Sequence, residues 1–126
     1  LLMMLHVAYS FIPMGLFVLG LGAQTAGLHL LGIGAIGGMT TSVIMRATLG
    51  HTGRALQIGP KLIVASSLIG LAAIVRSAMP DIKVGNLSGL EITAMLWTLG
   101  FAIMLATVGP WLWSANAKRR TPNKKP

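Results

Sequence analysis

Four long apolar stretches, separated by short polar connections, most constrain how this chain can fold. They cover about residues 2–21, 26–45, 60–79 and 90–113. A helix needs about 20 mostly apolar residues to cross the hydrocarbon core of a bilayer, and each stretch reaches that length. We therefore predict an all-α membrane protein with four transmembrane helices within residues 1–117, followed by a basic tail over residues 118–126.

The low charge content agrees with a membrane environment. Charged residues make up only 10% of the chain, whereas soluble domains carry about 25%. Apolar surface on this scale would drive aggregation in water, but lipid solvates it. The bilayer is therefore the first expected partner. The chain has no cysteine, which excludes disulfides and thiolate metal ligands within it.

The net charge of +8 does not indicate a nucleic-acid-binding protein, because of where the basic residues lie. No basic stripe alternates with aromatic residues, as a nucleic-acid groove would need. Half of the ten basic residues follow the last apolar stretch: Lys118, Arg119, Arg120, Lys124 and Lys125. Clustered Lys and Arg next to a hydrophobic helix are typical of the cytoplasmic flank of a membrane protein.

The basic residues also predict the orientation of the spans. The connection over residues 46–59 carries Arg46 and Arg54, whereas residues 22–25 carry no Lys or Arg and residues 80–89 carry only one Lys. Positive charge favours the cytoplasmic side. We expect residues 46–59 and the tail to be cytoplasmic, and the other two connections to lie outside.

Small residues recur every fourth position in the second stretch, at Gly34, Gly38 and Ser42. This spacing allows close approach of a neighbouring helix in lipid and predicts a buried helix. The segment also contains GIGAIG, which matches the dinucleotide-binding pattern GxGxxG. That pattern requires a preceding strand and an acidic residue about 20 residues later, and both are missing here, so helix packing explains the glycines better.

Three histidines are the main candidates for chemistry. His6 lies in the first stretch, His29 near the start of the second, and His51 in the following connection. An ionisable residue within a span is costly and is a functional candidate for that reason. Neutral imidazole is a good ligand for haem iron, copper or zinc. The alternative is a histidine that bonds to a hydroxyl or carbonyl of a neighbouring helix, and both interpretations stay open for His6 and His29.

Geometry limits how the two intramembrane histidines combine. In an antiparallel hairpin that turns near residues 23–24, His29 is level with about Val18 and His6 with about Thr41. At 1.5 Å per residue the two histidines are about 18 Å apart along the axis. They cannot bind one metal ion together, so each candidate ligand needs its other ligands from elsewhere in the protein.

The connection after the second stretch begins with RATLGHTGR. Gly50 and Gly53 allow a positive φ or close approach of a partner, and Arg46 and Arg54 flank His51. One interpretation is a loop that binds a small anion or a haem propionate, or that handles protons at the membrane surface. The other is a tight turn whose arginines follow the positive-inside bias, and the residues by themselves favour this second interpretation.

Residues 29–56 resemble the NnrS family of polytopic membrane proteins. The features shared are His29 at the opening of a helix, a glycine-rich turn followed by Met39, a Val–Met–Arg segment, and the LGHTGR sequence. One departure is Ile44, which separates the Val and the Met. The resemblance implies a bundle of about twelve spans in the bacterial inner membrane. This chain, which starts within an apolar run, is then expected to be the C-terminal portion.

The resemblance also implies haem and copper as cofactors and a role in the bacterial response to nitric oxide, in denitrification and in nitrosative stress. It marks His29, Arg46, His51 and Arg54 as motif positions and assigns no ligand among them. We take these four residues and His6, which lies outside the matched segment, as the candidate cofactor-binding residues. The candidate metal ligands are His29 and His6, the two histidines within spans. Two other functions stay open, namely a transporter or channel subunit and a non-catalytic membrane anchor or assembly subunit.

Overall fold

The computed structural model describes residues 1–113, so the predicted basic tail lies outside the described part of the chain. The elements in chain order are α1 (Leu2–Gly20), α2 (Gln24–His29), the π-helix η1 (Leu30–Gly37), α3 (Gly38–His51), α4 (Pro60–Ala78), β1 (Lys83–Val84), β2 (Leu87–Ser88) and α5 (Gly89–Trp113).

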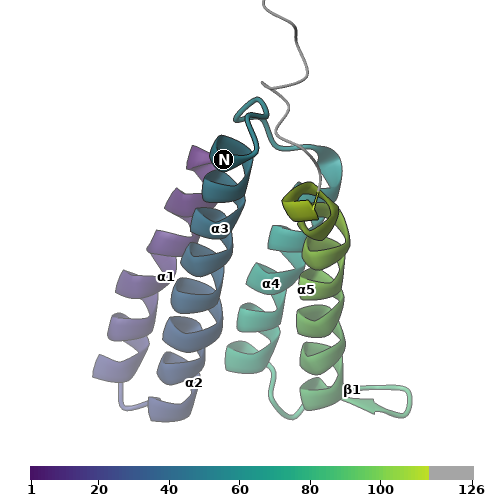
Figure 1. Cartoon of the computed structure of the whole chain (residues 1–126). Coiled ribbons are helices and arrows are strands. Elements are labelled where there is room, and N and C mark those ends of the chain that lie inside the picture. Colours follow the sequence, from purple (N-terminus) through teal and green to yellow (C-terminus); the bar gives the residue numbers. More distant parts are fainter. Residues whose placement is uncertain (114–126) are drawn as a thin grey trace, which may run out of the picture.

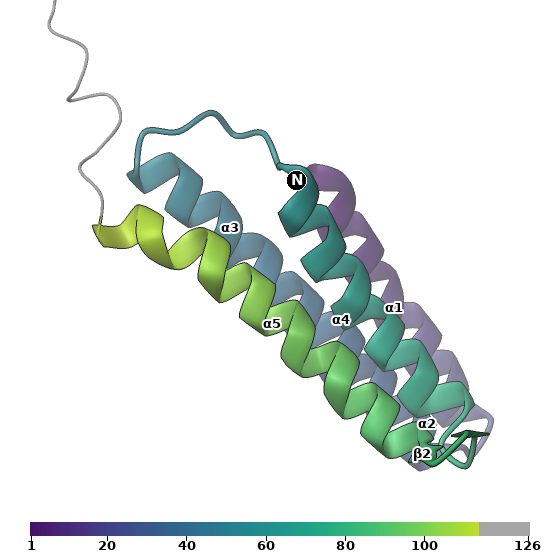
Figure 2. The same cartoon turned by 90° about the vertical axis from the view of Figure 1, so that its right-hand side faces the viewer.

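Within the described residues, four helical segments are long and apolar enough to cross a membrane: α1, the continuous segment Gln24–His51, α4 and α5. This confirms the predicted all-α membrane fold. The segments form two antiparallel pairs, α1 with α2, η1 and α3, and α4 with α5 (Figure 1). The connection between α3 and α4 lies at one end of the bundle, near the end of α5, and the small β-hairpin lies at the other (Figure 2).

The second span is longer than predicted. The apolar pattern predicts an end at residue 45, but α3 continues to His51, so residues 46–51 are helical and only residues 52–59 connect α3 to α4. The helix continues because Met45 and Leu49 keep its inner face buried, at 0% and 2% exposure, while Arg46 lies on the exposed face. A cation on the outer face does not end a helix.

The glycine-rich part of this span is a π-helix, which the sequence pattern does not predict. It covers LLGIGAIG and begins directly after His29, where α2 ends. Wide turns of this kind are rare and are found most often at functional sites. The π-helix therefore places an irregular backbone segment next to one of the candidate ligands.

The small residues of this span pack against α1, as predicted. A Cβ added to Gly34 would lie 2.5 Å from Cγ of Phe11, and one added to Gly38 would lie 2.8 Å from Cβ of Ala8. Both distances are too short for a real side chain, so only glycine permits this approach. In lipid, close packing of this kind is a main source of helix association.

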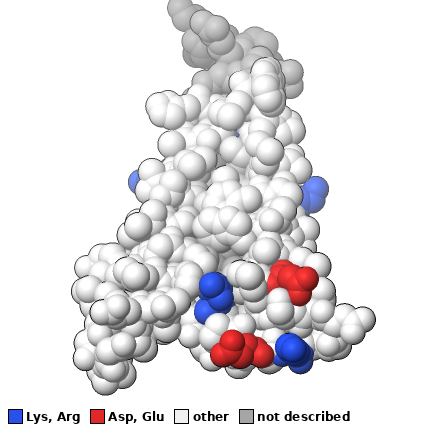
Figure 3. Space-filling view, turned by 90° about the horizontal axis from the view of Figure 1, so that it is seen from below, with Lys and Arg blue, Asp and Glu red and all other residues white. Residues whose placement is uncertain are grey.

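The two acidic residues of the chain lie at one end of the bundle, Asp81 in the connection between α4 and α5 and Glu91 in the first turn of α5. Between them is a two-stranded hairpin in which Lys83 pairs with Ser88. Seen from this end, acidic and basic patches lie close together on an otherwise largely uncharged surface (Figure 3). The backbone N–H and the hydroxyl of Ser88 donate to Oε2 of Glu91 at 2.8 and 2.7 Å. The N–H of Glu91 donates back to Ser88 Oγ at 3.3 Å. This capping box begins α5 and gives Glu91 a structural role.

Candidate functional site

The register of the first hairpin determines the levels of the intramembrane histidines. Ala8 lies opposite Gly38, and Phe11 lies opposite Gly34. His6 is therefore level with about residue 40, one residue from the predicted level. A Cβ added to Gly15 would meet Leu31 and the Gly27 carbonyl, so His29 is level with about Gly15, nine residues after His6 on α1. At 1.5 Å per residue of α-helix, the two histidines are about 14 Å apart along the axis, which is too far for them to bind one metal ion together.

His6 is exposed on the outer surface of α1, inside an apolar span. Its Nδ1–H donates to the carbonyl oxygen of Leu2 at 2.8 Å. A carbonyl can only accept, so Nδ1 carries the proton and Nε2 of the neutral ring keeps its lone pair. Metal-binding histidines show this arrangement, in which a backbone carbonyl orients the ring and the other nitrogen binds the metal.

His29 has a different environment. It is half-buried at the junction of α2 and η1, and α2 packs against α4. Its Nδ1 is buried without a hydrogen-bond partner among the described residues, and so is the hydroxyl of Ser77 near the end of α4. A buried polar atom without a partner is costly. The ring of His29 therefore has unused bonding capacity at this end of the bundle.

The motif RATLGHTGR does not form a loop around His51. Instead, His51 lies in the last turn of α3. The side chains of His51 and Arg46 are both exposed. Gly53 has a φ of +67°, its N–H bonds to the Gly50 carbonyl at 3.2 Å, and the N–H of Arg54 bonds to the Leu49 carbonyl at 2.9 Å. This is a Schellman cap, which requires a left-handed residue after the helix. The second glycine of the motif thus ends α3.

Arg54 is directed toward α5. Its guanidinium carbon lies 5.3 Å from the ring centroid of Trp111, a cation–π contact. Both residues line a cavity of about 330 Å³ that also includes Gln57 and Lys61. Sequence patterns do not predict this pairing, because the two residues are far apart in the chain and belong to different helix pairs.

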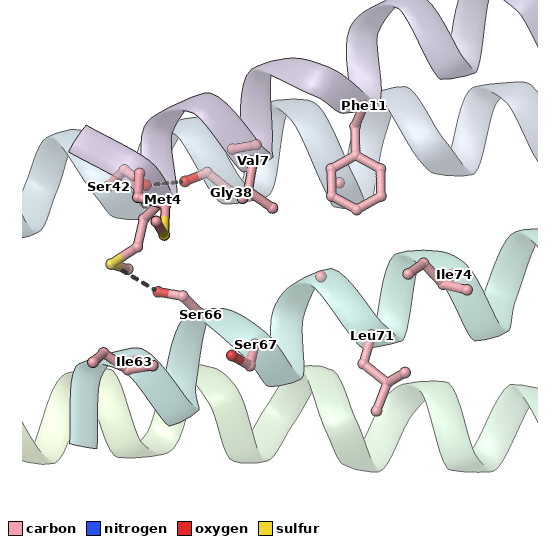
Figure 4. Close-up of a pocket in the computed structure, with 14 residues that line it drawn as sticks. Met4, Val7, Phe11, Gly38, Ser42, Ile63, Ser66, Ser67, Leu71 and Ile74 are labelled. Atoms are coloured by element: carbon pink, nitrogen blue, oxygen red, sulfur yellow. Dashed lines mark hydrogen bonds between the residues drawn. The ribbon is translucent and has the colours of Figure 1, made fainter. Parts of the chain in front are cut away.

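A larger apolar cleft of about 520 Å³ separates α1 and α3 from α4 (Figure 4). None of the described residues that line it is ionisable. The hydroxyl of Ser66 reaches across it toward the sulfur of Met4 at 3.8 Å. The cleft lies between the two helix pairs, and the residues that line it offer no charged side chain.

The described residues do not form a complete metal site. Among residues 1–113, no group of three or more His, Cys, Asp or Glu side chains lies close enough to hold a metal ion. His6, His29 and His51 lie at three different levels, and Arg46, His51 and Arg54 lie toward the end opposite His29. Each histidine by itself offers a single imidazole ligand.

A comparison with protein families identifies a matching family. A family model described as NnrS protein matches residues 1–116, and the match includes all three histidines and both arginines of the motif. No curated protein and no solved structure matches the chain.

Proposed function

The chain belongs to the NnrS family, and on that premise we propose that it is the C-terminal membrane region of a haem- and copper-containing protein. The protein would act in the bacterial response to nitric oxide and in denitrification. It would lie in the inner membrane, with residues 46–59 and the basic tail on the cytoplasmic side, where the positive charges favour them.

The geometry of His6 carries this proposal. An imidazole exposed in the apolar part of a span is costly unless it binds a partner. Its Nδ1–H is already bonded to the Leu2 carbonyl, which leaves Nε2 available as a metal ligand on the outer surface of α1. A bound haem iron or copper ion would supply a coordination position for a small molecule such as nitric oxide. The remaining ligands would come from spans outside this chain.

His29 would hold a second group. Its buried Nδ1 has no hydrogen-bond partner among the described residues. This is what we would expect if the ring binds a group that lies outside them. Because His6 and His29 are about 14 Å apart along the axis, they would serve two centres, in a family associated with both haem and copper. This chain would thus contribute one ligand to each centre.

The cationic motif residues would serve anionic groups on the His6 side of the bundle. Arg46 lies six residues beyond the level of His6, about 9 Å along the axis, and so could reach a propionate of a haem held there. His51 and Arg54 lie further toward the membrane surface. They are candidates to bind a second anion near that surface. They cannot reach a group bound at His29, which lies toward the opposite end of the bundle.

Cofactor content tests the proposal. In the purified full-length protein, His6→Ala and His29→Ala should each remove one type of centre, measured as haem absorbance and as copper by elemental analysis. Ser10→Ala is the matched control, because Ser10 is an exposed polar residue one turn beyond His6 whose hydroxyl bonds only to the Val7 carbonyl of its own helix. Full haem and copper content in both histidine variants would contradict the proposal.

A further inference from the structure

The cavity of about 330 Å³ beside Arg54 is built from three segments of the chain. The connection over residues 52–59 supplies Arg54 and Gln57, the start of α4 supplies Lys61, and the last turns of α5 supply Trp111. These segments converge at the end of the bundle opposite the β-hairpin (Figure 2). Two cationic side chains and one amide therefore line the same hollow.

The chain has no carboxylate side chain at this end to balance these charges. Its only acidic side chains are those of Asp81, in the connection between α4 and α5, and Glu91, in the first turn of α5, both at the other end. The first turn of α4 also contains no acidic residue, so the positive end of the helix dipole adds to the local potential. The electrostatics of the cavity thus favour an anion.

The contact with Trp111 orients Arg54 for such an anion. The guanidinium carbon lies over the indole ring, 5.3 Å from its centroid, and the planar guanidinium carries five N–H donors in a fixed fork. An Arg held in this way can donate two parallel bonds to one oxyanion. Gln57 adds an amide that can donate, but the hydroxyl of Thr107 is already used in a bond to the Ile103 carbonyl at 2.7 Å.

The level of the cavity indicates where the anion comes from. The 19 residues of α4 extend about 28 Å, close to the thickness of the hydrocarbon core, and Lys61 lies in the first turn. The cavity is therefore at the depth of the lipid headgroups, beside a tryptophan of the kind that favours this interface. We propose that the cavity binds the phosphate of an anionic phospholipid through Arg54, Lys61 and Gln57. This proposal does not depend on the metal centres.

Lipid binding to the full-length protein in neutral detergent tests the proposal, with native mass spectrometry as the readout. Phosphatidylglycerol, phosphatidylcholine and inorganic phosphate are the three probes. We expect phosphatidylglycerol to bind in preference to phosphatidylcholine. Lys61→Gln and Arg54→Gln should each weaken this binding about fivefold, which corresponds to about 1 kcal/mol per charge near a membrane surface.

Lys83→Gln is the matched control, because it removes the same charge from the exposed hairpin at the other end. It should leave phosphatidylglycerol binding unchanged. Equal losses in Lys61→Gln and Lys83→Gln would show nonspecific attraction and overturn the proposal. Binding of inorganic phosphate that is sensitive to Arg54→Gln, with no preference for phosphatidylglycerol, would identify a free-anion site and overturn it as well.

Discussion

Phe11 of α1 lies so close to Gly34 of η1 that a Cβ on the glycine would be 2.5 Å from Cγ of the phenylalanine. Phe11 is 5% exposed and belongs to a buried cluster with Leu30 and Ala73, so it joins the first helix pair to α4. The same contact sets the register of α1 against the second span. The level of His6, and with it the separation of the two candidate centres, depends on this packing.

Replacement of Gly34 by alanine should therefore destabilise the protein. The added methyl group would force Phe11 to move, and overpacking of this kind costs about 1–3 kcal/mol. Gly32→Ala is the control, because a Cβ there meets nothing within 4 Å. Thermal unfolding in detergent should show a lower midpoint for Gly34→Ala only. Equal midpoints for the two variants would show that Phe11 and Gly34 are not in tight contact.

Cysteine pairs test the register of the hairpin directly, and this chain contains no cysteine of its own. Ala8→Cys combined with Gly38→Cys places two thiols at the same level. The Cβ–Cβ distance of 2.8 Å is shorter than the roughly 3.8 Å of a disulfide, so the two helices must move apart by about 1 Å for the bond to form. Mild oxidation should cross-link this pair. The pair His6→Cys with His29→Cys should not cross-link at an axial separation of about 14 Å. A cross-link in the second pair would refute the separate levels of the histidines.

Gly53 and Gly50 should respond to alanine in opposite ways. Gly53 has a φ of +67°, and a residue with a side chain in that conformation costs about 1–3 kcal/mol. Gly50 is helical, exposed and open, so Gly50→Ala should stabilise α3 by up to about 1 kcal/mol. Denaturation midpoints compare the two variants. A loss of stability in Gly50→Ala that equals the loss in Gly53→Ala would contradict the helical cap.

The capping box at the start of α5 gives a further prediction. Ser88→Ala removes the hydroxyl that accepts a hydrogen bond from the Glu91 N–H. Loss of such a cap lowers the free energy of unfolding by about 1 kcal/mol. Ser88→Thr should retain most of the stability, because the threonine hydroxyl can still donate to Glu91 Oε2 and accept from the Glu91 N–H. Amide hydrogen exchange in the first turn of α5 should become faster in the alanine variant alone. Equal exchange rates in both variants would argue against the cap.

Sequence patterns predict the spans and the buried glycine face because both follow from local physics. Apolar length defines what can cross a bilayer, and small residues every fourth position define where helices approach. The predicted boundary at residue 45 is wrong because it places the end of the helix at a single cation, Arg46. A helix face tolerates a cation on its exposed side, and the Schellman cap at Gly53 is what ends α3.

Three other features could not be predicted from sequence patterns, each for its own reason. The π-helix arises within a glycine-rich run whose pattern fits an ordinary α-helix equally well. The contact between Arg54 and Trp111 requires the second helix pair to lie against the end of the first. The free Nε2 of His6 follows from one hydrogen bond to Leu2, which spacing alone does not specify.

Chemical rescue of His6 tests the central claim most directly. In the full-length protein, His6→Gly removes the ring and leaves space in which free imidazole can bind. We predict that this variant loses the haem or copper signal of one centre, and that added imidazole restores the signal while the centre assigned to His29 stays intact. An unaltered spectrum and full metal content in His6→Gly without imidazole would contradict the claim that Nε2 of His6 is a metal ligand.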